Sequence, residues 1–118
     1  MSTKTLGWLL TVFPILGLLS WATAGLPTSP AGEFEGGYAA FAAEIGGNPD
    51  RIHVNMGLAA IAYSVLIAAF ISLRGKVAEN GNSVFTALSG VLIVIGYAGT
   101  IAENGAYSAA ASLSSEGL

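Results

Sequence analysis

The sequence predicts an all-α integral membrane protein with three transmembrane helices, built as a single membrane domain over its 118 residues. Three long stretches, residues 5–32, 54–73 and 80–102, contain no charged side chain. A helix of about 20 mainly apolar residues crosses the hydrocarbon core of a bilayer, so each stretch is long enough to span it. The composition agrees, because 53% of the residues are hydrophobic and only 9% are charged, whereas a soluble domain has about 25% charged residues.

The charge balance and the absence of cysteine narrow the possible chemistry. The net charge is -3 and the four basic residues do not cluster, so the chain lacks the basic patch of a nucleic-acid-binding protein. Without cysteine there is no disulfide, no thiolate metal site and no cysteine nucleophile. There is also no glycine-rich phosphate-binding loop. We therefore expect neither an enzyme nor a nucleic-acid-binding protein.

The first span is expected at about residues 5–25. Trp8 and Trp21 would lie about 20 Å apart along a helix that rises 1.5 Å per residue, which places one indole near each membrane interface. Pro14 lies midway and predicts a static bend, because proline removes a backbone donor. The stretch also has an alternative interpretation as a signal peptide, with the small residues 22–24 as its cleavage site. We expect it to be retained as a span.

The second and third spans, about residues 52–73 and 83–102, are expected to form an antiparallel hairpin because only residues 74–82 join them. In the second span, small side chains recur every four residues and form a smooth stripe, which consists of Ala60, Ser64, Ala68 and Ser72. Gly96 and Gly99 give the third span a similar surface. Small residues let membrane helices approach closely, so both surfaces indicate packing against other helices.

A repeated tetrapeptide suggests where these two helices end. Ala-Glu-Asn-Gly occurs at residues 78–81 and again at residues 102–105. Asn-Gly favours a helix end because both residues tolerate a left-handed backbone. We therefore expect both helices to stop at these points. The tail, residues 106–118, is too polar and too short for a fourth span, and at most a short surface helix is expected there.

The connection between the first two spans, residues 26–51, is expected to contain a short amphipathic helix at about residues 38–45. Its apolar face shows helical spacing and consists of Phe34, Tyr38, Phe41 and Ile45. Such a helix lies in the membrane interface or docks on a partner. Asp50 is the expected N-cap of the span that follows.

The basic residues predict the orientation of the chain. Lys4, Arg74 and Lys76 fall on one side of a three-span arrangement, and Arg51 falls on the other. Because basic residues near membrane ends favour the cytoplasmic side, we expect a cytoplasmic N-terminus and an external C-terminus in the inner (cytoplasmic) membrane.

His53 is the only histidine and the one candidate for cofactor binding. An imidazole can ligate the iron of a haem, the magnesium of chlorophyll, copper or zinc. The competing and favoured interpretation is an interfacial side chain hydrogen-bonded to a neighbour or to a lipid headgroup. Glu44, Asp50 and Glu103 could share the outer side with His53, but nothing in their spacing brings the four together. We therefore expect no self-contained metal site.

The leading functional hypothesis is a non-catalytic accessory subunit of a larger membrane protein complex of the energy-converting kind, such as a respiratory or photosynthetic complex or a membrane oxidase or monooxygenase. Its expected partners are larger membrane subunits and bound lipids. The first alternative is a membrane subunit that binds a pigment or haem through His53. The second is a small homo-oligomeric transporter or channel, whose path would be lined by Tyr63, Ser64, Ser72 and Thr100.

Overall fold

The computed structural model describes residues 1–27, 35–79 and 84–117, without the side chains of residues 85 and 86. These residues form four helices, and no strand occurs among them. The helices are α1 (Thr3–Ala22), α2 (Gly37–Gly46), α3 (Pro49–Glu79) and α4 (Val84–Ser115). Three of them, α1, α3 and α4, are long and apolar enough to cross a membrane. The predicted all-helical architecture is therefore confirmed, and so is the presence of three helices able to span a bilayer.

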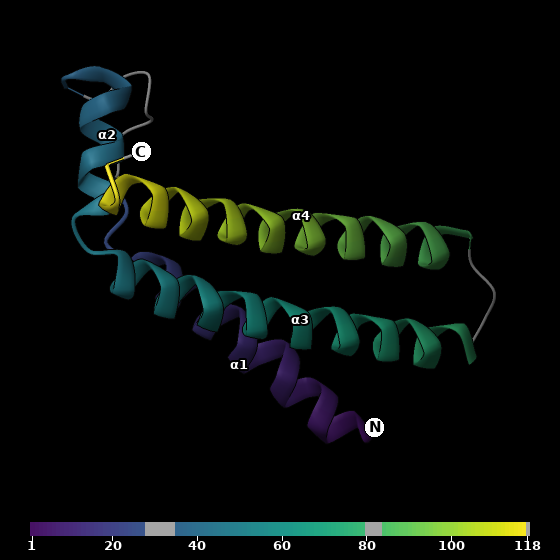
Figure 1. Ribbon diagram of the computed structural model, residues 1–118. Coiled ribbons are helices and arrows are strands. Elements are labelled where there is room, and N and C mark those ends of the chain that lie inside the picture. Colours follow the sequence, from purple (N-terminus) through teal and green to yellow (C-terminus); the bar gives the residue numbers. More distant parts are fainter. Residues whose placement is uncertain (28–34, 80–83, 118) are drawn as a thin grey trace.

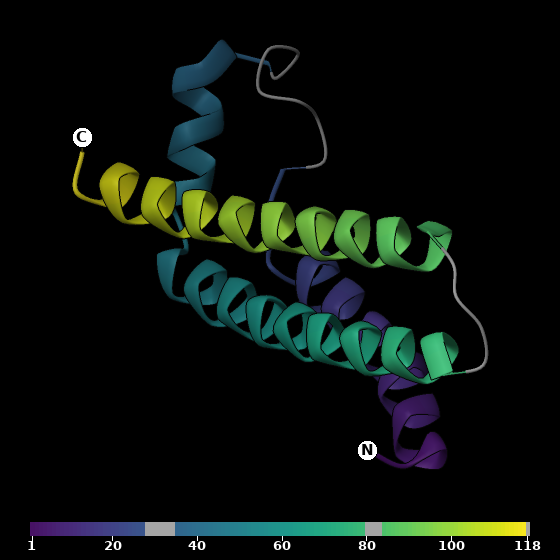
Figure 2. The same cartoon turned by 90° about the vertical axis from the view of Figure 1, so that its right-hand side faces the viewer.

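The long helices form an elongated bundle with α3 in the middle (Figure 1). Helix α4 runs antiparallel beside α3, and α1 crosses α3 on another side (Figures 1 and 2). Helix α2 stands crosswise at the end of the bundle where α3 begins and α4 finishes, and it packs mainly against α4. We call this the α2 end. The N-terminus lies toward the opposite end (Figure 1).

A cluster of buried side chains at the α2 end joins α2, α3 and α4 to the residues that follow α1. It consists of Ala24, Ile45, Ile52, Met56 and Ala111. Trp21 packs against this cluster and meets the Tyr107 ring edge-on, with 5.5 Å between the ring centroids. The indole that the sequence places at a membrane interface thus lies where α1 meets α4. Apolar burial and aromatic contacts stabilise this junction.

A second cluster lies nearer the middle of the bundle and consists of the buried residues Ala59, Tyr63 and Leu66. The Tyr63 ring stacks on Tyr97 of α4 at 5.4 Å between centroids. On the other side, a Cβ placed on Gly17 of α1 would lie only 2.7 Å from the Tyr63 ring. The glycine therefore lets α1 approach α3 closely, and the Tyr63 ring is buried between α1 and α4.

The start of α3 differs from the prediction. The helix begins at Pro49, and the Oδ1 atom of Asn48 accepts a hydrogen bond from the Arg51 amide at 3.4 Å. Asn48 therefore occupies the capping position, and the prediction of Asp50 as the N-cap is wrong. Asp50 lies in the first turn, where its negative charge favours the positive end of the helix dipole. Proline at the first helical position needs no amide donor, which explains the earlier start.

The two repeated tetrapeptides differ in outcome. Helix α3 extends past the predicted span end at residue 73 and ends at Glu79, within the first copy, where a helix end is predicted. Helix α4 continues through Asn104 and Gly105 to Ser115, so the predicted stop at residues 102–105 is wrong. Gly105 lacks the positive φ angle of a helix-ending glycine. A helical glycine costs about 1 kcal/mol relative to alanine, and the burial of Asn104 and Ala111 against the other helices offsets this cost.

The short helix α2 covers the predicted residues 38–45, with one more residue at each end, while its amphipathic, interfacial character stays a prediction. Gly36 has φ 90° at its N-cap, a backbone conformation that side chains other than glycine rarely adopt. Ser114 of α4 donates a hydrogen bond to the carbonyl oxygen of Ala42 in α2. A Cβ placed on Gly46 would come within 2.8 Å of the Ser114 backbone. Helix α2 is therefore seated tightly on the last turn of α4.

Candidate functional site

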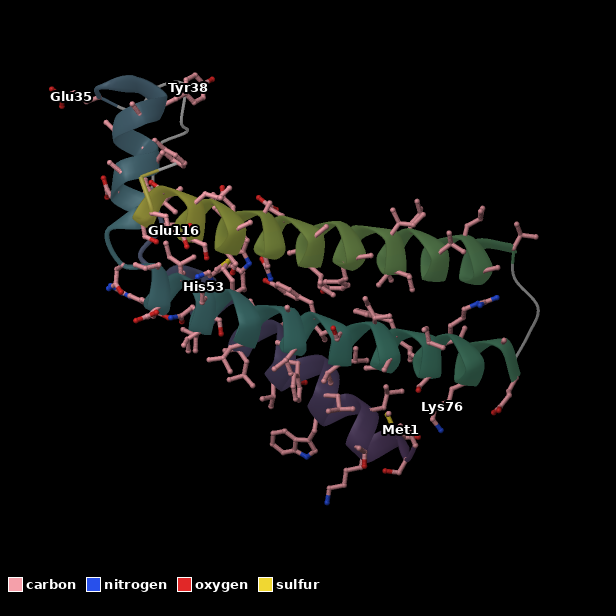
Figure 3. The ribbon with its side chains drawn as sticks, in the orientation of Figure 1. Met1, Glu35, Tyr38, His53, Lys76 and Glu116 are labelled. Carbon is pink, nitrogen blue, oxygen red and sulfur yellow. The ribbon has the colours of Figure 1, made fainter. Side chains whose placement is uncertain are left out.

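A groove between α3 and α4, close to the α2 end, contains the only histidine of the chain. It has a volume of about 250 Å³ and is lined by His53, Met56, Gly57, Ala60, Ile101, Asn104, Gly105 and Ser108. Figure 3 shows His53 at this end of the bundle, with Lys76 at the opposite end. Antiparallel packing places the first turns of α3 beside the last turns of α4, which is why these residues meet.

The imidazole of His53 is engaged by the neighbouring helix. Its Nε2 atom lies 2.9 Å from Oγ of Ser112, a hydrogen-bond distance. The two residues belong to the start of α3 and the end of α4, so this bond fixes the register of the two helices at the groove. The structure thus provides the hydrogen-bonded neighbour that the favoured interpretation expects, while cofactor binding by His53 stays a prediction. A metal or tetrapyrrole could use Nε2 only if the Ser112 hydroxyl moved away.

Asn104 is the buried polar side chain of the groove and has 1% of its surface exposed. Its Nδ2 atom donates a long hydrogen bond of 3.5 Å to the carbonyl oxygen of Met56. Its Oδ1 atom is buried and has no hydrogen-bond partner among the described residues. The same holds for the Nε1 atom of Trp21. A buried polar atom without a partner costs about 1–3 kcal/mol, so both atoms lower the stability of this end of the bundle.

The groove is lined by a glycine from each of its two helices. A Cβ placed on Gly57 of α3 or on Gly105 of α4 would meet nothing within 4 Å. A planar ring could therefore lie against either helix backbone with His53 beside it. Among the described residues, no group of three histidine, cysteine or acidic side chains could hold a metal ion. Glu44, Asp50, His53 and Glu103 do not form such a group among the described residues.

A second polar contact ties α1 to α3 at the same end. The Arg51 Nε atom donates a hydrogen bond of 2.7 Å to the carbonyl oxygen of Thr23, just after the last turn of α1. The Thr23 hydroxyl lies 3.0 Å from Oδ1 of Asn55, and Nδ2 of Asn55 bonds to the Arg51 carbonyl. The last carbonyls of a helix lack partners within the helix, and a basic side chain satisfies them well. Sequence reasoning did not find this contact.

The predicted small-residue stripe of α3 does not carry the contacts within the chain. The buried face of α3 is formed by Ile52, Met56, Ala59, Ala62, Tyr63, Leu66 and Ala69. Ser64 and Ala68 of the stripe are exposed, and Ala60 and Ser72 are half-buried. Gly96 and Gly99 of α4 are exposed as well. Their packing against partner helices stays a prediction, and these surfaces are uncovered in the single chain.

The predicted docking face of α2 is divided in two. Ile45 is buried in the cluster at the α2 end, and Phe41 packs against the same cluster. Tyr38 is 73% exposed near the outer tip of α2 (Figure 3). Phe34 lies outside the described residues. The part of the face nearest α4 is therefore used within the chain, which leaves Tyr38 for contact with a membrane interface or a partner.

Glu103 lies deeper along α4 than its predicted place after the helix end. About 18 Å of helix separates it from Ser115, and its neighbour Asn104 packs beside Met56 in the second turn of α3. Glu103 is exposed beside a groove of about 280 Å³ whose other lining residues are Phe41, Ile45, Ala106, Tyr107 and Ala110. No described residue forms a hydrogen bond or ion pair with its carboxylate. Glu103 lies away from the helix end because α4 continues to Ser115, which the sequence did not predict.

Comparisons with protein-family models, with curated protein sequences and with solved structures find no match to this chain.

Proposed function

We propose that the chain is a non-catalytic accessory subunit of a larger membrane protein complex, in which a helix of a larger subunit packs along α4. The observation that carries this proposal is one uncovered face of α4. It consists of Gly96, Gly99, Glu103, Ala106 and Ala110, which are all exposed and follow helical spacing. We call it the open face of α4.

The open face combines two properties that are unusual on a helix surrounded by lipid. Small residues are typical of membrane helices that meet other helices, because they allow close backbone approach. A carboxylate in a membrane helix is costly in lipid and normally faces protein or water. Lipid alone gives neither the glycines nor Glu103 a favourable partner. A neighbouring helix could pack closely on the glycines and bind the Glu103 carboxylate with a polar or basic side chain.

The low burial of the bundle supports the same proposal. Only 6% of the most apolar window of α4 is buried within the chain, against 33% for α3. Helix α3 is thus packed between α1 and α4, whereas α4 packs against the other helices on one side and is exposed on the rest of its surface. Ser64 and Ala68 add a small-residue surface on α3. Their position suggests that the chain inserts between larger subunits.

Photo-crosslinking from single cysteines tests this proposal. The chain has no cysteine, so one introduced cysteine carries a unique probe. A benzophenone maleimide on Gly99→Cys in native membranes should yield a discrete crosslink to a larger membrane subunit. The control is Leu18→Cys on α1, where the side chain is 65% exposed and lies away from the open face. Crosslinks from Gly99→Cys only to lipid, or only to a second copy of the chain, would contradict the proposal.

A second candidate function, the binding of a haem or a pigment through His53, has one specific observation in its favour. His53 lines a groove of about 250 Å³ together with Gly57 and Gly105, and neither glycine projects a side chain into the space beside the imidazole. An absorption spectrum of the complex purified from native membranes tests it. A visible band that disappears in His53→Ala, and persists in Ser112→Ala, is the expected result for a ligand on the imidazole. A colourless preparation would exclude this candidate.

A further inference from the structure

At the end of the bundle opposite α2, Arg74 lies on the line along which α3 and α4 meet. A Cβ placed on Gly90 of α4 would lie 2.8 Å from Cδ of Arg74, well inside the carbon contact distance of about 3.5–4.0 Å. The missing side chain of Gly90 therefore leaves room for the Arg74 methylenes against the backbone of α4. This contact keeps the arginine at the seam between the two helices.

An apolar groove lies on each flank of this seam, and Arg74 and Gly90 line both. One groove has a volume of about 270 Å³, and its other lining residues are Ile71, Val91, Val94 and Ile95. The second has a volume of about 150 Å³, and its other lining residues are Phe70, Leu73, Val77, Ser89 and Ile93. A cationic side chain thus lies between two mainly apolar grooves.

The guanidinium is available for an external anion. Arg74 is exposed, and within the described residues it forms no hydrogen bond or ion pair. It directly follows the uncharged stretch 54–73, at the depth where lipid headgroups begin. A guanidinium binds phosphate oxygens through two parallel hydrogen bonds, and this geometry makes arginine a preferred phosphate-binding residue.

We propose that the Arg74 seam binds one anionic diacyl phospholipid, with its phosphate on the guanidinium and one acyl chain in each flanking groove. The arrangement of one guanidinium between two apolar grooves corresponds to the arrangement of one phosphate headgroup above two acyl chains. Lys76 is on the same α3 segment, so the potential at this end favours an anionic over a zwitterionic headgroup. This site goes beyond the proposed function and does not depend on it, because it belongs to the single chain.

Native mass spectrometry of the full chain in detergent tests the site, with dioleoyl phosphatidylglycerol and dioleoyl phosphatidylcholine as probes. One phosphatidylglycerol should bind several-fold more tightly than phosphatidylcholine. Arg74→Gln should weaken phosphatidylglycerol binding about tenfold, since a hydrogen bond to a charged group contributes roughly that factor. Arg74→Lys should give an intermediate loss, because the charge remains and the bidentate geometry is lost. Helicity measured by circular dichroism shows that each variant is folded.

Two matched controls separate a built site from general surface attraction. Lys76→Gln removes a positive charge close by, at a residue that lines neither groove, and should weaken binding clearly less than Arg74→Gln does, because Lys76 contributes only to the potential at this end. Gly90→Ala should weaken binding because the new Cβ displaces Arg74, whereas Gly99→Ala, in open space, should not. The proposal is overturned by an unchanged affinity in Arg74→Gln, by equal affinity for the two lipids, or by equal losses in Arg74→Gln and Lys76→Gln.

Discussion

Arg51 at the start of α3 donates a hydrogen bond from Nε to the carbonyl oxygen of Thr23, with 2.7 Å between the two atoms. Gly25 makes room for this contact, because a Cβ at that position would lie 3.3 Å from the guanidinium. Of the four basic residues, Arg51 is the one that the sequence places on the external side of the membrane, whereas basic residues near membrane ends usually lie on the cytoplasmic side. Its hydrogen bond to a carbonyl group at the end of α1 explains why an arginine occurs at this position.

Arg51→Gln should therefore loosen the end of α1 from α3. We expect the free energy of unfolding to fall by about 1 kcal/mol, because a partly exposed hydrogen bond from a charged donor is lost. Unfolding in dodecyl sulfate, followed by circular dichroism, measures this change. Lys4→Gln is the control, since Lys4 forms no contact with α3 among the hydrogen bonds of the described residues. Equal stability of the Arg51 variant and the unmodified chain would refute the structural role.

Gly46→Ala should detach α2 from α4. The added Cβ would lie within 2.8 Å of both the backbone and the side chain of Ser114, and the backbone cannot move without displacing the helix. We expect amide hydrogen exchange in α2 to become at least about tenfold faster, which corresponds to a loss of roughly 1.4 kcal/mol of local stability. Gly57→Ala, which meets nothing within 4 Å, should leave exchange in α2 unchanged. Unaltered protection in Gly46→Ala would mean that α2 is not seated on Ser114.

Gly105→Ala tests the continuity of α4. A glycine in the interior of a helix is less favourable than alanine, so this substitution should stabilise the chain by about 0.5–1 kcal/mol. Thermal unfolding of the chain in detergent measures the effect. Alanine is strained in the left-handed backbone conformation of a helix-ending glycine. If Gly105→Ala destabilised the chain, Gly105 would therefore end the helix, as the sequence predicts, and the long α4 would be contradicted.

The sequence is a good guide to the long helices and a poor guide to their ends. The uncharged stretches predict α1, α3 and α4 because only apolar helices of this length suit a hydrocarbon layer. Asn-Gly locally favours a helix end, but α4 continues past it. Asn104 is buried beside Met56, and Ala111 packs into the buried cluster at the α2 end. Tertiary burial outweighed local propensity there.

The candidate site was predictable only in part for the same reason. The sequence singles out His53 as the lone histidine and predicts a hydrogen-bonded neighbour. It could not identify Ser112 as that neighbour, because the tail containing Ser112 was not expected to be helical or to lie against α3. Asn55 and Arg51 gave no signal either, since their contacts with Thr23 depend on the angle at which α1 crosses α3. Contacts of this kind depend on the register between distant helices.

Asn104→Leu should be tolerated or stabilising. The substitution removes a buried acceptor that has no partner among the described residues and replaces it with an apolar side chain of similar shape. Such replacements are nearly neutral or favourable. We expect the free energy of unfolding to change by less than about 1 kcal/mol or to rise, as measured in dodecyl sulfate. A loss of more than about 2 kcal/mol would show that Oδ1 has an essential polar partner.

We expect this chain to work as part of a larger membrane assembly. Mass photometry of the tagged chain, extracted from its native membrane in polymer-bounded lipid discs, measures the mass of that assembly. The particles should contain the chain together with at least one larger subunit in a fixed ratio, as identified by mass spectrometry of the same sample. Particles that contain only this chain, either as one copy or as an integer multiple of its mass, would contradict it.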